Sequence, residues 1–143
     1  MPMRKIAYWA STALLSLIYA GGAFAYLTQR DMVEEGFIHF GFPAYLITVL
    51  IVAKIAAPIA ILTRASVLLS DLAYAGMFFH LLLAVSAHLN AADGGFAPAL
   101  VGLVLLVISF LTQNAARKRP SPNVPGALRS HELQPSSRTS PSV

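Results

Sequence analysis

One lysine lies in the middle of a long apolar segment, where an ammonium group is costly. Lys54 comes nine residues into the run 45–62, which places it about 13 Å along a helix and near the middle of a bilayer. Insertion scales put the cost of a lysine at that depth at roughly 2.5–3.5 kcal/mol. Pro58 lacks the amide hydrogen that would bond the carbonyl group of Lys54. A backbone acceptor is therefore expected beside the charge, at a kink in the helix.

Two interpretations of Lys54 follow from this position. In the functional one, Lys54 lines a polar cavity that binds a lipid headgroup, an anion or a quinone carbonyl. In the structural one, the side chain extends to the membrane interface and the proline kink is merely tolerated.

Two histidines in the next apolar segment could extend such a cavity. His80 and His88 are eight residues apart and share a broad face of a helix, with His88 near the outer boundary. They could form a polar track from the outer surface toward Lys54. A shared metal ion is disfavoured because the two side chains lie about 12 Å apart along the axis. The simpler interpretation of His80 is a buried neutral histidine bonded to a neighbouring helix.

Further candidates lie in the polar segment 28–44 and at the start of the third apolar run. Glu35 and His39 are four residues apart, so a short helix would place them on one face. They could cap the mouth of the cavity, pair with Lys54 or bind a metal; solvated loop charges are the alternative. Tyr74 could line a quinone or lipid pocket, although helix packing is the commoner use. Asp71 is expected to cap the third long helix or to interact with its dipole, and Arg64 is near enough in sequence to pair with it.

The elements that position these residues follow from the composition. The chain is 57% hydrophobic and only 11% charged, against about 25% charged residues in soluble domains. Four continuous apolar runs, at about 6–27, 45–62, 72–89 and 96–112, approach the roughly 20 residues that span a bilayer. Continuous runs favour helices over a barrel. The sequence therefore predicts an all-α integral membrane four-helix bundle with short loops, formed by residues 1–114.

The basic residues predict the orientation of this bundle. Arg4, Lys5, Arg64 and the run 117–119 fall on one side if the helices alternate, and the opposite side is mostly acidic. The positive-inside rule then places both termini in the cytoplasm. Residues 115–143 are rich in Pro, Ser and Arg and are predicted to form a disordered cytoplasmic tail. Residues 1–25 also resemble a cleavable secretory signal, but their apolar stretch is longer than a signal core.

Other features exclude several classes of function. The formal net charge is +4, yet the basic residues form no stripe interleaved with aromatic residues, so no nucleic-acid partner is expected. The chain has no cysteine, which excludes disulfides, thiolate metal sites and thiol redox chemistry. No complete set of catalytic side chains is present, so we predict no catalytic residues and no metal site.

Several short motifs, taken in order, resemble one family of membrane proteins. They are the segment 41–45 before the second run, Lys54 within it, the segments 71–79 and 86–89 in the third run, and the turn at 93–94. On these motifs, residues 5–112 resemble the DoxX-like family of small four-helix bacterial membrane proteins. The family takes its name from a subunit associated with a terminal quinol oxidase. The resemblance implies a bacterial inner membrane, a quinone or redox connection, and no defined reaction.

Two functions from different classes are therefore open. The first is a redox-associated subunit that binds a quinone or a similar lipid around Lys54 and depends on a redox partner in the membrane. The second is a non-enzymatic small transporter, lipid-binding protein or assembly protein. The lipid bilayer is the expected partner in both cases, and a homo-oligomer is compatible with both.

Overall fold

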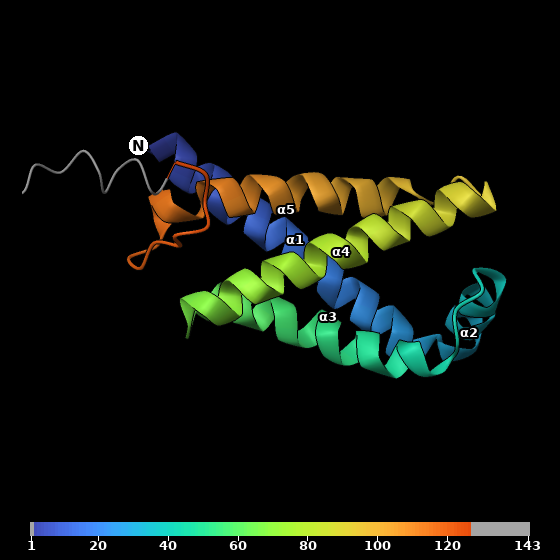
Figure 1. Ribbon diagram of the computed structural model, residues 1–143. Helices are drawn as coiled ribbons and strands as arrows, with labels where there is room; N and C mark the ends of the chain where they lie inside the picture. The colour runs from blue at the N-terminus through green and yellow to red at the C-terminus, as the bar shows by residue number, and fades with distance from the viewer. Residues whose placement is uncertain (1, 127–143) are drawn as a thin grey trace, which may run out of the picture.

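The protein is a bundle of helices (Figure 1), described by a computed structural model that covers residues 2–126. The helices are α1 (Pro2–Thr28), α2 (Arg30–His39), α3 (Tyr45–Thr63), α4 (Val67–Ala91) and α5 (Ala97–Ala116). All except α2 are long and apolar enough to cross a membrane. The prediction of an all-α bundle with four long apolar helices is confirmed.

Each long helix is at least as long as its apolar run, because polar or small residues at the ends continue the helical hydrogen bonding. The largest extension is in α4, which begins at Val67 after the N-cap Ser66, whose hydroxyl accepts a hydrogen bond from the Leu69 amide at 3.4 Å. The prediction that Asp71 caps this helix is wrong, since the serine five residues earlier does so.

The four long helices pack in a ring in which α1 contacts α3 and α5, and α4 also contacts α3 and α5. The main core contains Leu15, Tyr19, Ile61, Tyr74, Met77, Leu81 and Leu106. Many large apolar side chains instead point outward, among them Leu17, Phe24, Val52 and Phe79, each more than 60% exposed. An apolar exterior of this kind suits a lipid solvent.

The two ends of the bundle differ in their contents. The N-terminus, the α3–α4 turn and the end of α5 lie together at the left of Figure 1. We call this the basic end, because Arg4, Lys5, Arg64 and the run 117–119 belong to these segments. Helix α2 and the α4–α5 turn lie at the right of the same view. We call that the α2 end.

The start of the expected disordered tail is ordered. Helix α5 continues to Ala116, and the chain then turns back so that Ser121 and Val124 are buried. Asp71 accepts hydrogen bonds from the Ser121 hydroxyl at 2.6 Å and from the Asn123 amide at 2.8 Å. These bonds give the segment 117–126 a fixed place that its Pro- and Ser-rich composition does not indicate. The rest of the expected tail, 127–143, lies outside the described residues.

Candidate functional site

Lys54 is buried against helix α1. The side chain is 8% exposed, and its Nζ lies 5.2 Å from the centre of the Tyr19 ring and 4.9 Å from that of Tyr26. Within residues 2–126 no carboxylate pairs with it, since His88–Asp93 is the ion pair found there. The ammonium group is therefore held by two aromatic faces, an interaction that is stronger where water is excluded.

Helix α1 is shaped to receive this side chain. Tyr19, Gly22 and Tyr26 follow one another at spacings of three and four, so they lie on one face of the helix. A Cβ atom at Gly22 would lie 3.0 Å from Lys54 Nζ. The missing side chain thus leaves the space that the ammonium group occupies between the two tyrosines.

His80 is linked to the same tyrosine. Its Nδ1 lies 2.9 Å from the Tyr19 hydroxyl, which is also 3.3 Å from the carbonyl oxygen of Met77. His80 is therefore bonded to a neighbouring helix, as the simpler interpretation of the sequence expects. Tyr19 lies between the two candidates: its ring faces Lys54 and its hydroxyl reaches His80.

These groups open on a cavity of about 370 Å³ between α3 and α4. Lys54, His80 and Tyr19 supply its polar groups, and the rest of the lining is apolar and mostly small, from Leu50, Ala53, Ala56, Ala57, Ala60, Leu69, Leu72, Ala73, Gly76 and Met77. We call this the Lys54 cavity. A few polar groups in a concave apolar wall of this size are typical of a binding site for a small molecule.

A smaller cavity of about 110 Å³ continues toward the α2 end. Leu50 and His80 line both cavities, and the smaller one also contacts Tyr26, Phe40 and His88. His80 therefore lies at the junction of two spaces, the first containing Lys54 and the second reaching His88.

His88 is tied to the turn that follows α4. Its Nδ1 lies 2.9 Å from both carboxylate oxygens of Asp93, and its ring meets that of Phe40 edge to face at 4.9 Å. The Gly95 amide donates to Asp93 at 2.8 Å. This amide, with a smaller contribution from His88, lowers the pKa of the Asp93 carboxyl group below its usual value.

The structure does not bring Glu35 and His39 to the cavities. Both residues are exposed on α2, and the smaller cavity is lined instead by Phe37 of that helix and by Phe40, which follows its last residue. Among residues 2–126 there is also no cluster of three His, Asp or Glu side chains that could hold a metal ion. The segment of α2 and its C-cap thus cover this end of the bundle with aromatic rings, and the exposed Glu35 and His39 fit the alternative of solvated charges.

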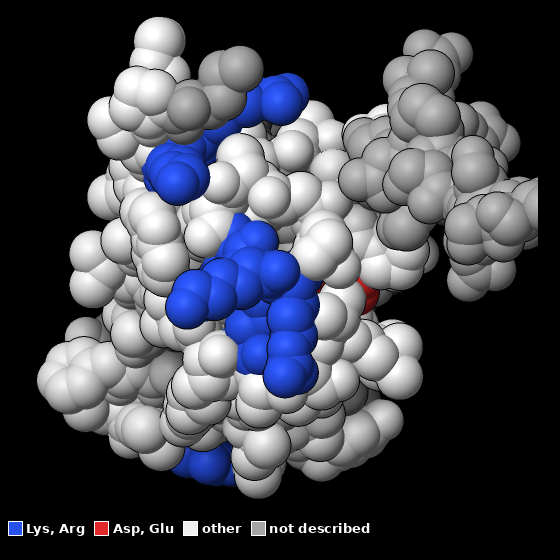
Figure 2. Space-filling view, turned by 90° about the vertical axis from the view of Figure 1, so that its left-hand side faces the viewer, with Lys and Arg blue, Asp and Glu red and all other residues white. Residues whose placement is uncertain are grey.

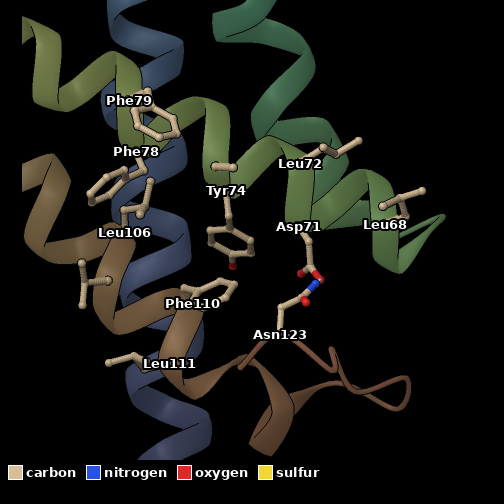
Figure 3. A pocket seen from close by; sticks show the side chains of 12 residues that line it. Leu68, Asp71, Leu72, Tyr74, Phe78, Phe79, Leu106, Phe110, Leu111 and Asn123 are labelled. Atoms are coloured by element: carbon tan, nitrogen blue, oxygen red, sulfur yellow. The ribbon is translucent and has the colours of Figure 1, made fainter. Parts of the chain in front are cut away.

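Tyr74 lies on a different side of α4 from the Lys54 cavity. Its hydroxyl is 2.7 Å from that of Ser109, which is 2.6 Å from the Thr12 hydroxyl. Tyr74 also lines a separate cavity of about 510 Å³ between α4 and α5 (Figure 3), together with apolar residues such as Phe78 and Phe110. This pocket does not contain Lys54, and a role of Tyr74 in binding a quinone or lipid stays a prediction.

Sequence analysis did not assign Tyr19, Gly22 or Tyr26 to the site. The available signal was the spacing 19–22–26, in which two aromatic residues flank a glycine on one helix face. A lysine in an apolar helix requires a partner, and this face is one that could receive an ammonium group.

The lowered pKa of Asp93 predicts a dependence of stability on pH. A carboxyl group whose pKa is lower in the folded state stabilises the protein above the unfolded value of about 3.9, and this contribution is lost as the pH falls through the folded value. The wild-type protein should therefore be more stable than Asp93→Asn at pH 5, and the difference should shrink by pH 3. Thermal unfolding in detergent measures it, with Asp31→Asn as the control for loss of one acidic charge. A difference in stability between wild type and Asp93→Asn that grows toward pH 3 would contradict the lowered pKa of Asp93.

Comparison with known proteins assigns the family. The family model described as the DoxX-like family matches residues 10–112. No curated protein and no solved structure matches the chain. The matched range reaches into all four long helices and includes Lys54, His80 and His88. Since it covers most of the chain, this protein belongs to the DoxX-like family of membrane proteins.

Proposed function

We propose that this protein binds a quinone or a similar amphiphile in the Lys54 cavity, and that it acts as an accessory subunit of a redox system in the membrane. The observation that carries the proposal is the Lys54 ammonium group, which is 8% exposed, has no carboxylate partner among residues 2–126, and lines a cavity of about 370 Å³. A buried charge without a counter-ion is costly in an apolar bundle. A bound acceptor would offset that cost.

The lining of the cavity supports a ligand with a polar head and an apolar body. Lys54 donates hydrogen bonds, and Tyr19 and His80 can donate or accept them. The remaining wall is made mainly of alanine and leucine side chains, which suit a ring or a hydrocarbon chain. A quinone combines two carbonyl acceptors with such a body. The sequence has no cysteine, so we assign the electron transfer to the bound molecule and a partner protein.

A second candidate function is transport or transfer of a lipid-like solute. The smaller cavity favours it, because His80 and Leu50 line both spaces and the smaller one reaches His88 near the α2 end. A ligand that entered beside His88 could therefore pass His80 on its way to Lys54. In this role the protein would be a non-enzymatic carrier or lipid-binding protein.

Replacing Lys54 tests ligand binding directly. Wild-type protein purified from native membranes in mild detergent should carry an enriched amphiphile with a carbonyl or anionic group, detected by mass spectrometry of its organic extract. Lys54→Met keeps an unbranched side chain that is one heavy atom shorter and has no charge, and it should reduce that species at least tenfold. Lys5→Met, an exposed position on α1, is the matched control.

The identity of the enriched species separates the two candidate functions. A quinone that is lost in Lys54→Met, together with co-purification of a redox enzyme, supports the accessory-subunit role. Enrichment of a lipid other than a quinone supports the role of a carrier or lipid-binding protein. Equal recovery of every lipid from wild type and Lys54→Met would sink the proposal that the cavity binds a ligand through this lysine.

We also propose that the protein spans the bacterial inner membrane with the basic end in the cytoplasm, which would place both termini there. The support is the grouping of Arg4, Lys5, Arg64 and the run 117–119 at one end of the bundle, since basic residues favour the cytoplasmic side.

Reporter fusions test this orientation. Alkaline phosphatase is active only outside the cytoplasm, so a fusion after Val143 should be inactive and one inserted at Gly94 should be active. A green fluorescent protein fused after Val143 should fluoresce. The reverse pattern would contradict the proposed orientation.

A further inference from the structure

We propose that the basic end holds a specific site for the phosphate group of an anionic phospholipid. The site is a groove of about 350 Å³ where the ends of α3 and α5 meet the start of α1, lined by Trp9, Thr63, Arg64, Ala116, Arg117, Lys118 and Arg119. We call it the basic groove. It lies at the opposite end of the bundle from His88 and is separate from the Lys54 cavity.

Arg117 is held rigidly by its neighbours. Its Nε donates to the Tyr8 hydroxyl at 2.7 Å, and its Nη2 donates to the carbonyl oxygens of Ile61 and Leu62 at 2.6 and 2.8 Å. The guanidinium carbon lies 4.7 Å from the centre of the Trp9 ring. In the described part of the chain Nη1 makes no hydrogen bond, so this one amino group of the fixed guanidinium is available to a ligand.

Arg64 is oriented in the same way, by neutral acceptors. Its Nε and Nη2 donate to the carbonyl oxygen of Arg119 at 3.1 and 2.7 Å, and its Nη1 donates to the Gln113 side chain. The expected pair with Asp71 does not form, because that carboxylate bonds to Ser121 and Asn123.

The positive charge of the groove is therefore not neutralised by the described protein. Both buried or half-buried guanidinium groups bond to neutral oxygens, and no carboxylate of residues 2–126 forms an ion pair with either, or with Lys118 or Arg119. Figure 2 shows basic side chains gathered on this end of the molecule, with little acidic surface among them. Four cationic residues around one groove favour an anionic group.

The chemistry of the groove points to a phosphate that belongs to a lipid. The Nη1 group of Arg117 can donate charge-assisted hydrogen bonds to phosphate oxygens, and a basic residue at a membrane surface contributes about 1 kcal/mol toward binding anionic lipid. Trp9 is the aromatic type found at the level of the headgroups. Exposed Ile6 and Leu62 lie beside the groove on α1 and α3, at 64% and 40% exposure, and provide an apolar surface along which acyl chains can lie.

The single tryptophan reports on this site. Trp9 is the one tryptophan of the chain and lines the groove, so bromine atoms on a bound lipid will quench its fluorescence. The full-length protein is reconstituted into vesicles of equal parts phosphatidylglycerol and phosphatidylcholine, with bromine on the acyl chains of one lipid or the other. We expect stronger quenching when the phosphatidylglycerol is brominated.

The matched variants each remove two exposed charges from the basic end. Lys118→Gln/Arg119→Gln removes two from the groove, and these side chains make no hydrogen bond in the described structure; Arg4→Gln/Lys5→Gln removes two that do not line it. The groove variant should lower the preference for phosphatidylglycerol by about fivefold per charge, and the control by much less. Equal quenching by both lipids, or equal effects of the two variants, would overturn the proposal.

Free phosphate is the remaining source of the same chemistry. Inorganic phosphate is added to the vesicles at 10 mM and compared with potassium chloride of equal ionic strength. If the groove binds a lipid, the protein should keep its preference for phosphatidylglycerol both in phosphate and in potassium chloride. Loss of the preference in phosphate alone would assign the groove to the free anion and overturn the lipid assignment.

Discussion

Lys54 places an ammonium group in the middle of a helix that is otherwise apolar, and the neighbouring helices provide the contacts that accommodate it. Helix α1 presents Tyr19 and Tyr26 to the charge, and Gly22 leaves space for it. Pro58 lies one turn further along α3 and leaves the Lys54 carbonyl group without its helical hydrogen bond. The polar groups of the Lys54 cavity are thus gathered at one level, between α1, α3 and α4.

The two ends of the bundle are held together by different interactions. At the basic end, Arg117 donates to the carbonyl oxygens that close α3 and to the Tyr8 hydroxyl on α1. Arg64 donates to the Gln113 side chain on α5 and to the carbonyl oxygen of Arg119. At the α2 end, aromatic rings and the His88–Asp93 pair cover the cavity that adjoins His80. Arginine therefore fixes one end, whereas the opposite end is closed by a separate short helix. This difference fits entry of a ligand beside α2.

The long helices are predictable from sequence because length and hydropathy decide them, whereas the contacts of the site depend on how helices pack. Lys54 stands out as a charge in an apolar run, but its partners lie on another helix at distant positions in the chain. Tyr74 is six residues before His80, so it points about 120° away from it around the helix, and the helical spacing alone separates the two. The position of Ser121 could not be predicted, because the composition of its segment resembles that of a flexible tail. Its contacts with Asp71 and Asn114, which are distant in sequence or on another element, fix it.

The central claim is that Lys54 serves ligand binding and does not stabilise the fold. The effect of replacing Lys54 on the free energy of unfolding tests this claim most directly. The measurement is the free energy of unfolding in a dodecyl sulfate titration, for delipidated wild type, Lys54→Met and the control Lys5→Met. Since methionine fills most of the same space without a buried charge, Lys54→Met should be as stable as wild type or more stable by about 1–3 kcal/mol. A loss of 1 kcal/mol or more in Lys54→Met, on the scale of a cation–π contact, with Lys5→Met unchanged, would show that the lysine holds the bundle together and would contradict this account.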